Sequence, residues 1–145
     1  YGAGREAMDW VLGESDFVLV STPLMDSTQN LIGERELSLL RPNAYLINPA
    51  RGNIVNEKAL YNALVNKSIA GAAIDTWYEY PVSSDDSPRP SKYPFWELEN
   101  VIMTPHHSGA TIGTLDRRAA TVAANIDRLA KGQPLMNVIS DFGAK

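Results

Sequence analysis

The sequence predicts a doubly wound α/β fold in three layers (α/β/α), with a parallel β-sheet between two layers of helices. Short apolar runs suited to strands alternate along the chain with longer stretches that have the apolar spacing of helices. The run Phe-Val-Leu-Val at residues 17–20 has no polar alternation, which is typical of a parallel strand covered on both faces. Parallel neighbours need crossover connections, and right-handed crossovers place helices on the faces of the sheet.

Each element of this fold has its own signal in the sequence. We expect strands at the apolar runs 17–20, 44–47, 71–74 and 101–103. We expect helices at the stretches with helical apolar spacing, residues 5–12, 33–40, 56–66 and 112–129. Gly13 is predicted to stop the first helix, Asn56 to cap the third through its side-chain oxygen, and Gly132 to close the last. Residues 81–94 contain four prolines and predict an extended surface loop.

Size and composition exclude several classes of function. One globular domain is expected of 145 residues with 44% hydrophobic content. The formal charge of -4, with basic residues scattered among acids, argues against nucleic acid or an anionic membrane surface as a partner. The chain has no cysteine, which excludes a disulfide framework, a thiolate metal site and a cysteine nucleophile. No apolar segment approaches the roughly 18 to 20 residues of a membrane span, and the first residues lack the layout of a signal peptide, so we expect a soluble cytoplasmic protein.

Polar residues follow all four predicted strands. They are Thr22-Pro23, Asn48 to Arg51, Asp75, and His106-His107-Ser108. In parallel sheets the carboxyl ends of the strands meet at one edge, where ligands bind. Each residue alone also fits a surface salt bridge, a helix cap or a solvated histidine, but the set indicates a site.

The chemistry of this set suggests redox work on a hydroxy or keto acid. Arg51 offers a planar fork of donors for a carboxylate, and His106 can give or take a proton near neutral pH. The hydride would have to come from a cofactor. No metal site is expected, because His106 and His107 are adjacent and diverge on an extended chain, and no carboxylate lies at a familiar ligand spacing.

Four blocks of sequence resemble the D-isomer-specific 2-hydroxyacid dehydrogenases. They are Ser15-Asp16-Phe17-Val18 to Pro23-Leu24, Asn48-Pro49-Ala50-Arg51-Gly52-Asn53-Ile54-Val55-Asn56-Glu57, Gly71-Ala72-Ala73-Ile74-Asp75, and Asn100-Val101-Ile102-Met103-Thr104-Pro105-His106. The resemblance implies a Rossmann-like fold and NAD- or NADP-dependent hydride transfer between a 2-keto acid and a 2-hydroxy acid.

The resemblance also implies roles for individual residues. Arg51 resembles the arginine that binds the substrate carboxylate beside the nicotinamide, and His106 resembles the general acid/base. Asp75 matches the carboxylate that contacts the nicotinamide amide. The other residues expected to line the cofactor pocket are Thr22, Pro23, Thr28, Pro49, Ala50, Ser108 and Gly109.

One departure from the family lies at Tyr80. The family usually has a Glu immediately before the Pro that follows the third of these strands, where it hydrogen-bonds the catalytic His; here Tyr80 occupies that place and Glu79 precedes it. On an extended backbone a one-residue slip turns Glu79 to the opposite side, so Tyr80 is expected at His106, with Glu79 as the fallback. Formate dehydrogenases of the wider family also have a neutral residue there, which leaves a formate dehydrogenase-like enzyme as a minor alternative.

A second departure is that no Gly-x-Gly-x-x-Gly motif occurs in the chain. Residues 1–145 therefore resemble only the second half of the dinucleotide-binding domain, without the glycine-rich half or the substrate domain. We expect such a partial Rossmann-like domain to bind NAD weakly alone, and to self-associate or form a homodimer. The alternative from another class is a dinucleotide-binding assembly protein, since the C-terminal binding protein corepressors share this fold and resemble the enzymes at Arg51 and His106.

Overall fold

The structure is a computed structural model that describes residues 4–83 and 86–138. The chain divides into two compact units, residues 1–108 and residues 109–145. The first unit contains the sheet and the second contains one long helix, and each is described by itself.

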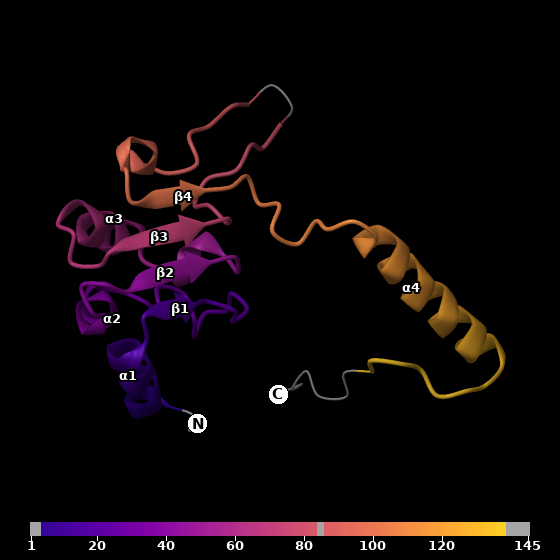
Figure 1. Cartoon of the computed structure of the whole chain (residues 1–145). Coiled ribbons are helices and arrows are strands. Elements are labelled where there is room, and N and C mark those ends of the chain that lie inside the picture. The colour runs from indigo at the N-terminus through magenta and orange to yellow at the C-terminus, as the bar shows by residue number, and fades with distance from the viewer. Residues whose placement is uncertain (1–3, 84–85, 139–145) are drawn as a thin grey trace. The chain divides into compact units, whose positions relative to one another are not determined.

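The first unit is built on a four-stranded parallel sheet. The strands are β1 (Phe17–Leu19), β2 (Tyr45–Asn48), β3 (Gly71–Ile74) and β4 (Val101–Met103), in the order β1-β2-β3-β4. Every neighbouring pair is parallel, and the arrows in Figure 1 point the same way. The carboxyl ends of all four strands therefore meet at one edge, and the predicted parallel sheet of a Rossmann-like fold is confirmed.

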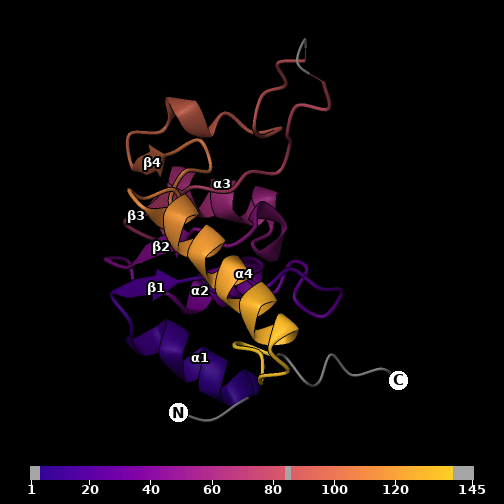
Figure 2. The ribbon, with the colours of Figure 1, turned by 90° about the vertical axis from the view of Figure 1, so that its right-hand side faces the viewer.

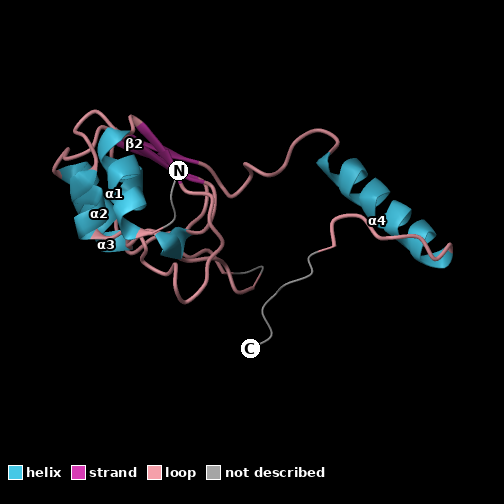
Figure 3. Cartoon of the chain, turned by 90° about the horizontal axis from the view of Figure 1, so that it is seen from below, coloured by secondary structure: helices cyan, strands magenta, loops and turns pink. Residues whose placement is uncertain are grey.

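The helices of the first unit lie together on one face of this sheet. They are α1 (Arg5–Glu14), α2 (Glu34–Leu39) and α3 (Glu57–Val65), with short 3-10 turns η1 (Gly52–Ile54) and η2 (Phe95–Glu97). Figure 3 shows the three α-helices on the same side of the strands. Because the strands follow one another in order across the sheet, right-handed crossovers bring successive helices to the same face. The first unit thus contains two of the three predicted layers.

The register explains which side chains form the core. Val18, Leu46 and Ala72 are register partners in adjacent strands, are buried, and belong to the hydrophobic core. One residue further along each strand, the side chains turn to the opposite face, so Leu19 and Ile102 are exposed. The expectation that the run at residues 17–20 is covered on both faces is therefore corrected for Phe17 and Leu19 within this unit, because no described helix of the unit lies on the second face.

Helix ends follow local hydrogen bonding. Asn56 caps α3 as predicted, since its side-chain oxygen accepts the N–H of Ala59 at 3.0 Å. Gly13 does not stop α1, which continues to Glu14, because the N–H of Ser15 still donates to the carbonyl of Val11 and extends the last turn. In the described parts of residues 81–94 there is no α-helix or strand, as expected of a proline-rich loop.

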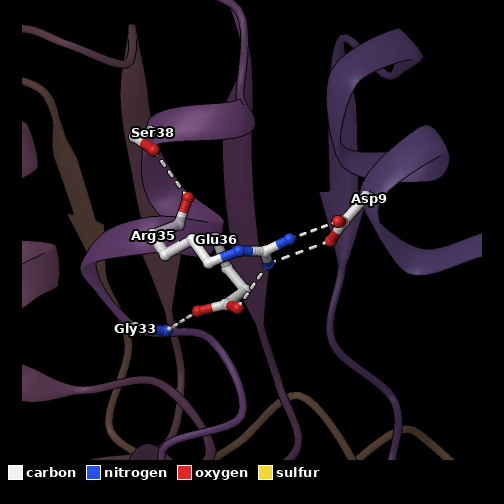
Figure 4. Close-up of polar contacts among 5 residues, drawn as sticks. All are labelled: Asp9, Gly33, Arg35, Glu36 and Ser38. Atoms are coloured by element: carbon white, nitrogen blue, oxygen red, sulfur yellow. Dashed lines mark hydrogen bonds and ion pairs between the residues drawn. The ribbon is translucent and has the colours of Figure 1, made fainter. Parts of the chain in front are cut away.

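An ion-pair cluster ties α1 to α2 (Figure 4). The Arg35 guanidinium pairs with both carboxylate oxygens of Asp9 and, at 2.8 Å, with Glu36 Oε1. The other oxygen of Glu36 accepts the N–H of Gly33 at 3.1 Å, where it satisfies one of the free donors at the start of α2. The pKa of Asp9 is lowered by the hydrogen bond and charge of Arg35. Glu36 is buried, which raises its pKa, but the hydrogen bonds from Arg35 and Gly33 outweigh this and lower it overall.

The second unit contains α4 (Thr114–Ala130), a single unbroken helix in Figure 2. It begins after Gly113 and is followed by Gly132, which both have a left-handed backbone, with φ of 77° and 63°. The predicted apolar stripe is present, and Leu115, Val122 and Ile126 on it are exposed. Among the described residues, no helix of either unit has the length and apolar character needed to cross a membrane.

Candidate functional site

The site begins where β1 and β2 end. The residues after these strands line a pocket of about 420 Å³, formed by Ser21, Thr22, Pro23, Leu24, Ala50 and Arg51. The pocket combines a hydroxyl-bearing segment with a guanidinium, so it can receive a ligand that has both polar groups and negative charge.

Buried Asn48 holds the turn that presents Arg51. Its side-chain nitrogen donates to the carbonyl of Arg51 at 3.0 Å, and its side-chain oxygen accepts the N–H of Ala50 at 3.1 Å. Arg51 itself is exposed and donates to the carbonyl of Ala50 at 2.6 Å. The described part of the chain contains no carboxylate paired with Arg51, so its guanidinium remains available to an anion. The sequence analysis includes Asn48 in the polar set that follows the strands but assigns it no individual role, although asparagine directly before a turn is a recognised signal for this kind of hydrogen bonding.

Gly52 lets this turn approach the segment that follows β3. A Cβ atom at Gly52 would lie 2.5 Å from the carbonyl oxygen of Trp77, a distance that such atoms do not tolerate. The backbone after Arg51 therefore packs directly on the backbone at Trp77 and Tyr78. This contact links the ends of β2 and β3.

Asp75, the residue after β3, is buried and bonded to the segment after β4. Its Oδ1 accepts the hydroxyl of Thr104 at 2.6 Å and the N–H of His107 at 2.9 Å. Its Oδ2 accepts the N–H of Ser108 at 3.0 Å and the Ser108 hydroxyl at 2.5 Å. Burial raises the pKa of this carboxyl, but the hydrogen bonds from Ser108, Thr104 and His107 outweigh burial and bring the pKa far below its ordinary range.

His106 lies inside the segment that Asp75 holds. Its backbone is left-handed, with φ of 58°, a conformation that is uncommon for residues with a side chain. Its Nδ1 lies 3.1 Å from the hydroxyl oxygen of Tyr80, and the same oxygen accepts the N–H of Trp77 at 2.9 Å. The indole N–H of Trp77 donates to the carbonyl of Thr104 at 2.9 Å, which gives a second link between the two strand ends.

The hydroxyl of Tyr80 can form a hydrogen bond with Nδ1 of His106 whether or not Nδ1 carries a proton. Trp77 occupies one lone pair of the oxygen, so the phenol proton is free to be donated to an unprotonated Nδ1. When Nδ1 is protonated, the second lone pair of the oxygen can accept its proton. In either case Nε2 of His106 is the ring nitrogen left for a ligand.

The remaining residues predicted from the sequence are placed less directly. Glu79 is exposed and lies 3.9 Å from the Lys92 ammonium, and no hydrogen bond to His106 is found for it within the described residues. Thr28 donates to the carbonyl of Pro23 at 2.8 Å and so braces the loop after β1. Pro49 is half-buried beside Asn48, and Gly109 is the first residue of the second unit. No group of three or more potential metal ligands is found in the ranges 4–83 and 86–138.

The structure thus brings Arg51, Asp75, Tyr80 and His106 to the carboxyl edge of one sheet, where Thr22, Pro23 and Ala50 border the pocket beside Arg51. A guanidinium for an anion and an imidazole with a fixed Nδ1 partner suit proton transfer on a carboxylate-bearing substrate.

Comparison with known proteins identifies one family. Residues 1–108 match the D-isomer specific 2-hydroxyacid dehydrogenase, NAD binding domain family. A glyoxylate reductase of Korarchaeum cryptofilum is 37% identical over 133 residues, which are 92% of this chain and 38% of that protein. The chain therefore spans less than half the length of this curated relative.

Solved structures agree with this match. The NAD complex of a D-isomer specific 2-hydroxyacid dehydrogenase from Lactobacillus delbrueckii ssp. bulgaricus has a TM-score of 0.77 and 33% identity, over 91% of this chain and 42% of that one. The corresponding protein of Xanthobacter autotrophicus Py2, in complex with NADPH and MES, has a TM-score of 0.76 and 33% identity, over 94% of this chain and 53% of that one.

Proposed function

The chain belongs to the D-isomer specific 2-hydroxyacid dehydrogenase family through its NAD binding domain, and on this premise we propose that it takes part in hydride transfer between NAD(H) or NADP(H) and a 2-keto or 2-hydroxy acid. The observation that supports this proposal most strongly is that two groups lie at the same sheet edge: Arg51, which has no carboxylate partner among the described residues, and His106, whose Nδ1 is held by Tyr80. The known relative named glyoxylate reductase makes a small keto acid such as glyoxylate the first substrate to try.

Arg51 would bind the substrate. A guanidinium can hold a carboxylate through two parallel hydrogen bonds, which fixes the orientation of the keto group next to it. The turn held by Asn48 keeps Arg51 beside the pocket of Thr22, Pro23 and Ala50, where we propose that the cofactor binds. A bound nicotinamide supplies or accepts the hydride.

His106 would transfer the proton that accompanies the hydride. In reduction, Nε2 gives a proton to the keto oxygen as that oxygen becomes a hydroxyl. In oxidation, Nε2 takes the hydroxyl proton, while Nδ1 keeps its own proton and donates it to the Tyr80 oxygen throughout. We propose Tyr80 as the residue that orients His106, with Glu79 in the outer position.

The test uses the complete gene product that contains this chain, with loss of reduced nicotinamide followed for NADH and NADPH against glyoxylate, hydroxypyruvate and pyruvate. Arg51→Lys keeps the charge but loses the fork, so KM for the keto acid should rise about tenfold or more. His106→Asn keeps a residue that accepts the left-handed backbone, and kcat should fall by about 10²-fold or more. Arg41→Lys, at a surface pair with Glu14, is the matched control and should change neither constant.

A lack of turnover across the whole panel, together with association that depends on dinucleotide, would contradict the proposal and favour an assembly protein. The partial-domain assignment, the weak binding of NAD by the 145-residue chain, the homodimer and the cytoplasmic location stay predictions.

A further inference from the structure

We propose that Asp75 is a positioning residue for His106, holding the segment from Thr104 to Ser108 in place from within the protein. This inference deepens the proposed function and rests on it for the meaning of His106. It differs from the expectation that Asp75 contacts the nicotinamide amide.

The first argument is that the carboxylate has no acceptor position left. An ionised carboxylate offers about four lone-pair sites on its two oxygens. In Asp75 the two on Oδ1 are taken by Thr104 and His107, and the two on Oδ2 are taken by the amide and hydroxyl of Ser108. A cofactor amide would have to displace one of these donors. The side chain is also well covered, since Asp75 as a whole is 5% exposed.

The second argument is where the four donors lie. They flank His106 on both sides along the chain, with Thr104 two residues before it and His107 and Ser108 directly after it. His106 itself has the left-handed backbone with φ of 58°, which costs free energy and persists only when the surroundings enforce it. Asp75 supplies the bonds that fix both ends of this strained residue.

The third argument is that Asp75 is itself rigidly anchored. It directly follows β3, and its N–H donates to the carbonyl of Asn48 at 3.1 Å, which continues the ladder between β2 and β3. The N–H of Thr104 donates to the carbonyl of Ile74 at 3.0 Å, which continues the ladder between β3 and β4. The carboxylate is therefore fixed relative to the sheet, and its hydrogen bonds fix residues 104–108 relative to the sheet as well. The pKa of Asp75 lies far below its ordinary range, as expected of a carboxylate whose ionised form is stabilised by hydrogen bonds from Ser108, Thr104 and His107.

The proposed consequence for the site is the contact between Tyr80 and His106. With the loop held, Nδ1 lies 3.1 Å from the Tyr80 hydroxyl. When the carboxylate is lost, His106 should relax toward an ordinary backbone and leave Tyr80.

The test is nuclear magnetic resonance on the 145-residue chain, which needs no turnover. Asp75→Asn replaces one carboxylate oxygen with an NH₂ donor that faces other donors. The amide protons of His107 and Ser108 should then exchange with solvent about tenfold faster or more, and the nuclear Overhauser contact between the Tyr80 and His106 rings should disappear. Asp26→Asn, at an exposed aspartate outside the site, is the matched control and should change none of these signals.

If Asp75→Asn unfolds the chain, a variant that removes only one of the four hydrogen bonds to Asp75 can still test the proposal. Ser108→Ala removes one hydroxyl donor and leaves the backbone N–H, so Ser108 exchange should rise about threefold with the sheet amides unaltered. Unchanged exchange in both variants, with the Tyr80 and His106 contact intact, would overturn the proposal. So would loss of NADH binding by Asp75→Asn in the complete gene product while its loop amides stay protected, since Asp75 would then act on the cofactor. Failure of that protein to reduce any keto acid would count against the proposed function and leave the loop result standing.

Discussion

At the scale of single residues, the sequence predicts which side chains gather but not how they are bonded. Arg51, Asp75 and His106 could be foreseen because each follows an apolar run, and parallel strands end at one edge. The four donors on Asp75 could not, because they depend on the backbone after β4 turning back through a left-handed His106. The short polar residues Thr104 and Ser108 on either side of the histidine were the available signal.

Tyr80 gives a prediction at this scale. Tyr80→Phe keeps the ring, whose centroid lies 5.7 Å from that of His106, and removes the hydroxyl that holds Nδ1 and accepts the N–H of Trp77. In the complete gene product we expect kcat for keto-acid reduction to fall about tenfold with KM little changed, because the proton donor loses its orientation while the carboxylate site is intact. Steady-state kinetics measures both constants.

A second substitution, Tyr80→Glu, tests the effect of a negative charge beside His106, whereas Tyr80→Phe tests the effect of losing the hydrogen bond that orients it. Tyr80→Glu places a carboxylate beside the imidazole and stabilises the imidazolium, so the pH range in which reduction is fast should extend upward. Tyr93→Phe, in the aromatic group with Tyr61, is the control for losing a phenol elsewhere. Full kcat in Tyr80→Phe would show that the hydroxyl of Tyr80 does not orient His106.

At the scale of elements, the sequence predicts the end of a helix where a single local hydrogen bond decides it. The Asn56 cap needs only its own helix, and the structure has it. The prediction that Gly13 stops α1 is wrong, because the low helix propensity of one glycine is outweighed by the bond from Ser15 to Val11, which extends the helix past it. Coverage of the sheet could not be read from Phe17-Val18-Leu19, because the covered face depends on the order of all the strands.

The pairing of α1 with α2 predicts how stability responds to acid. The pKa values of Asp9, Glu36 and Asp75 all lie below their ordinary values, so the unfolded chain binds protons first as the pH falls. The stabilisation from these carboxylates is therefore complete above about pH 5, and it is lost progressively below about pH 4. Thermal unfolding by circular dichroism should show a nearly constant melting temperature above about pH 5 and a steep fall below about pH 4.

Arg35→Gln tests the share of this effect that belongs to the helix pair. It removes the cation beside Asp9 and Glu36, so the melting temperature should be lower near neutral pH and should fall less between about pH 5 and pH 3. Lys58→Gln, at an exposed lysine of α3 for which no ion pair is found among the described residues, removes the same charge and serves as the control. An acid response that is identical in Arg35→Gln and in the unaltered chain would show that the helix pair does not contribute.

At the scale of the whole molecule, the second face of the sheet predicts association of the 145-residue chain. Phe17 and Ile102 on this face are each 68% exposed, and the ring of Phe17 stacks on that of Tyr45 at 5.5 Å to form an apolar surface. β1 and β4 are also the terminal strands of the described sheet, and open edges can pair with further strands.

Sedimentation velocity over a range of concentrations should show reversible association. The double change Phe17→Ser with Ile102→Ser should weaken this association, whereas Val82→Ser, at an exposed loop residue, should not. If the chain stays monomeric throughout, or if only Ile126→Ser on α4 suppresses association, this face is not the surface that self-associates.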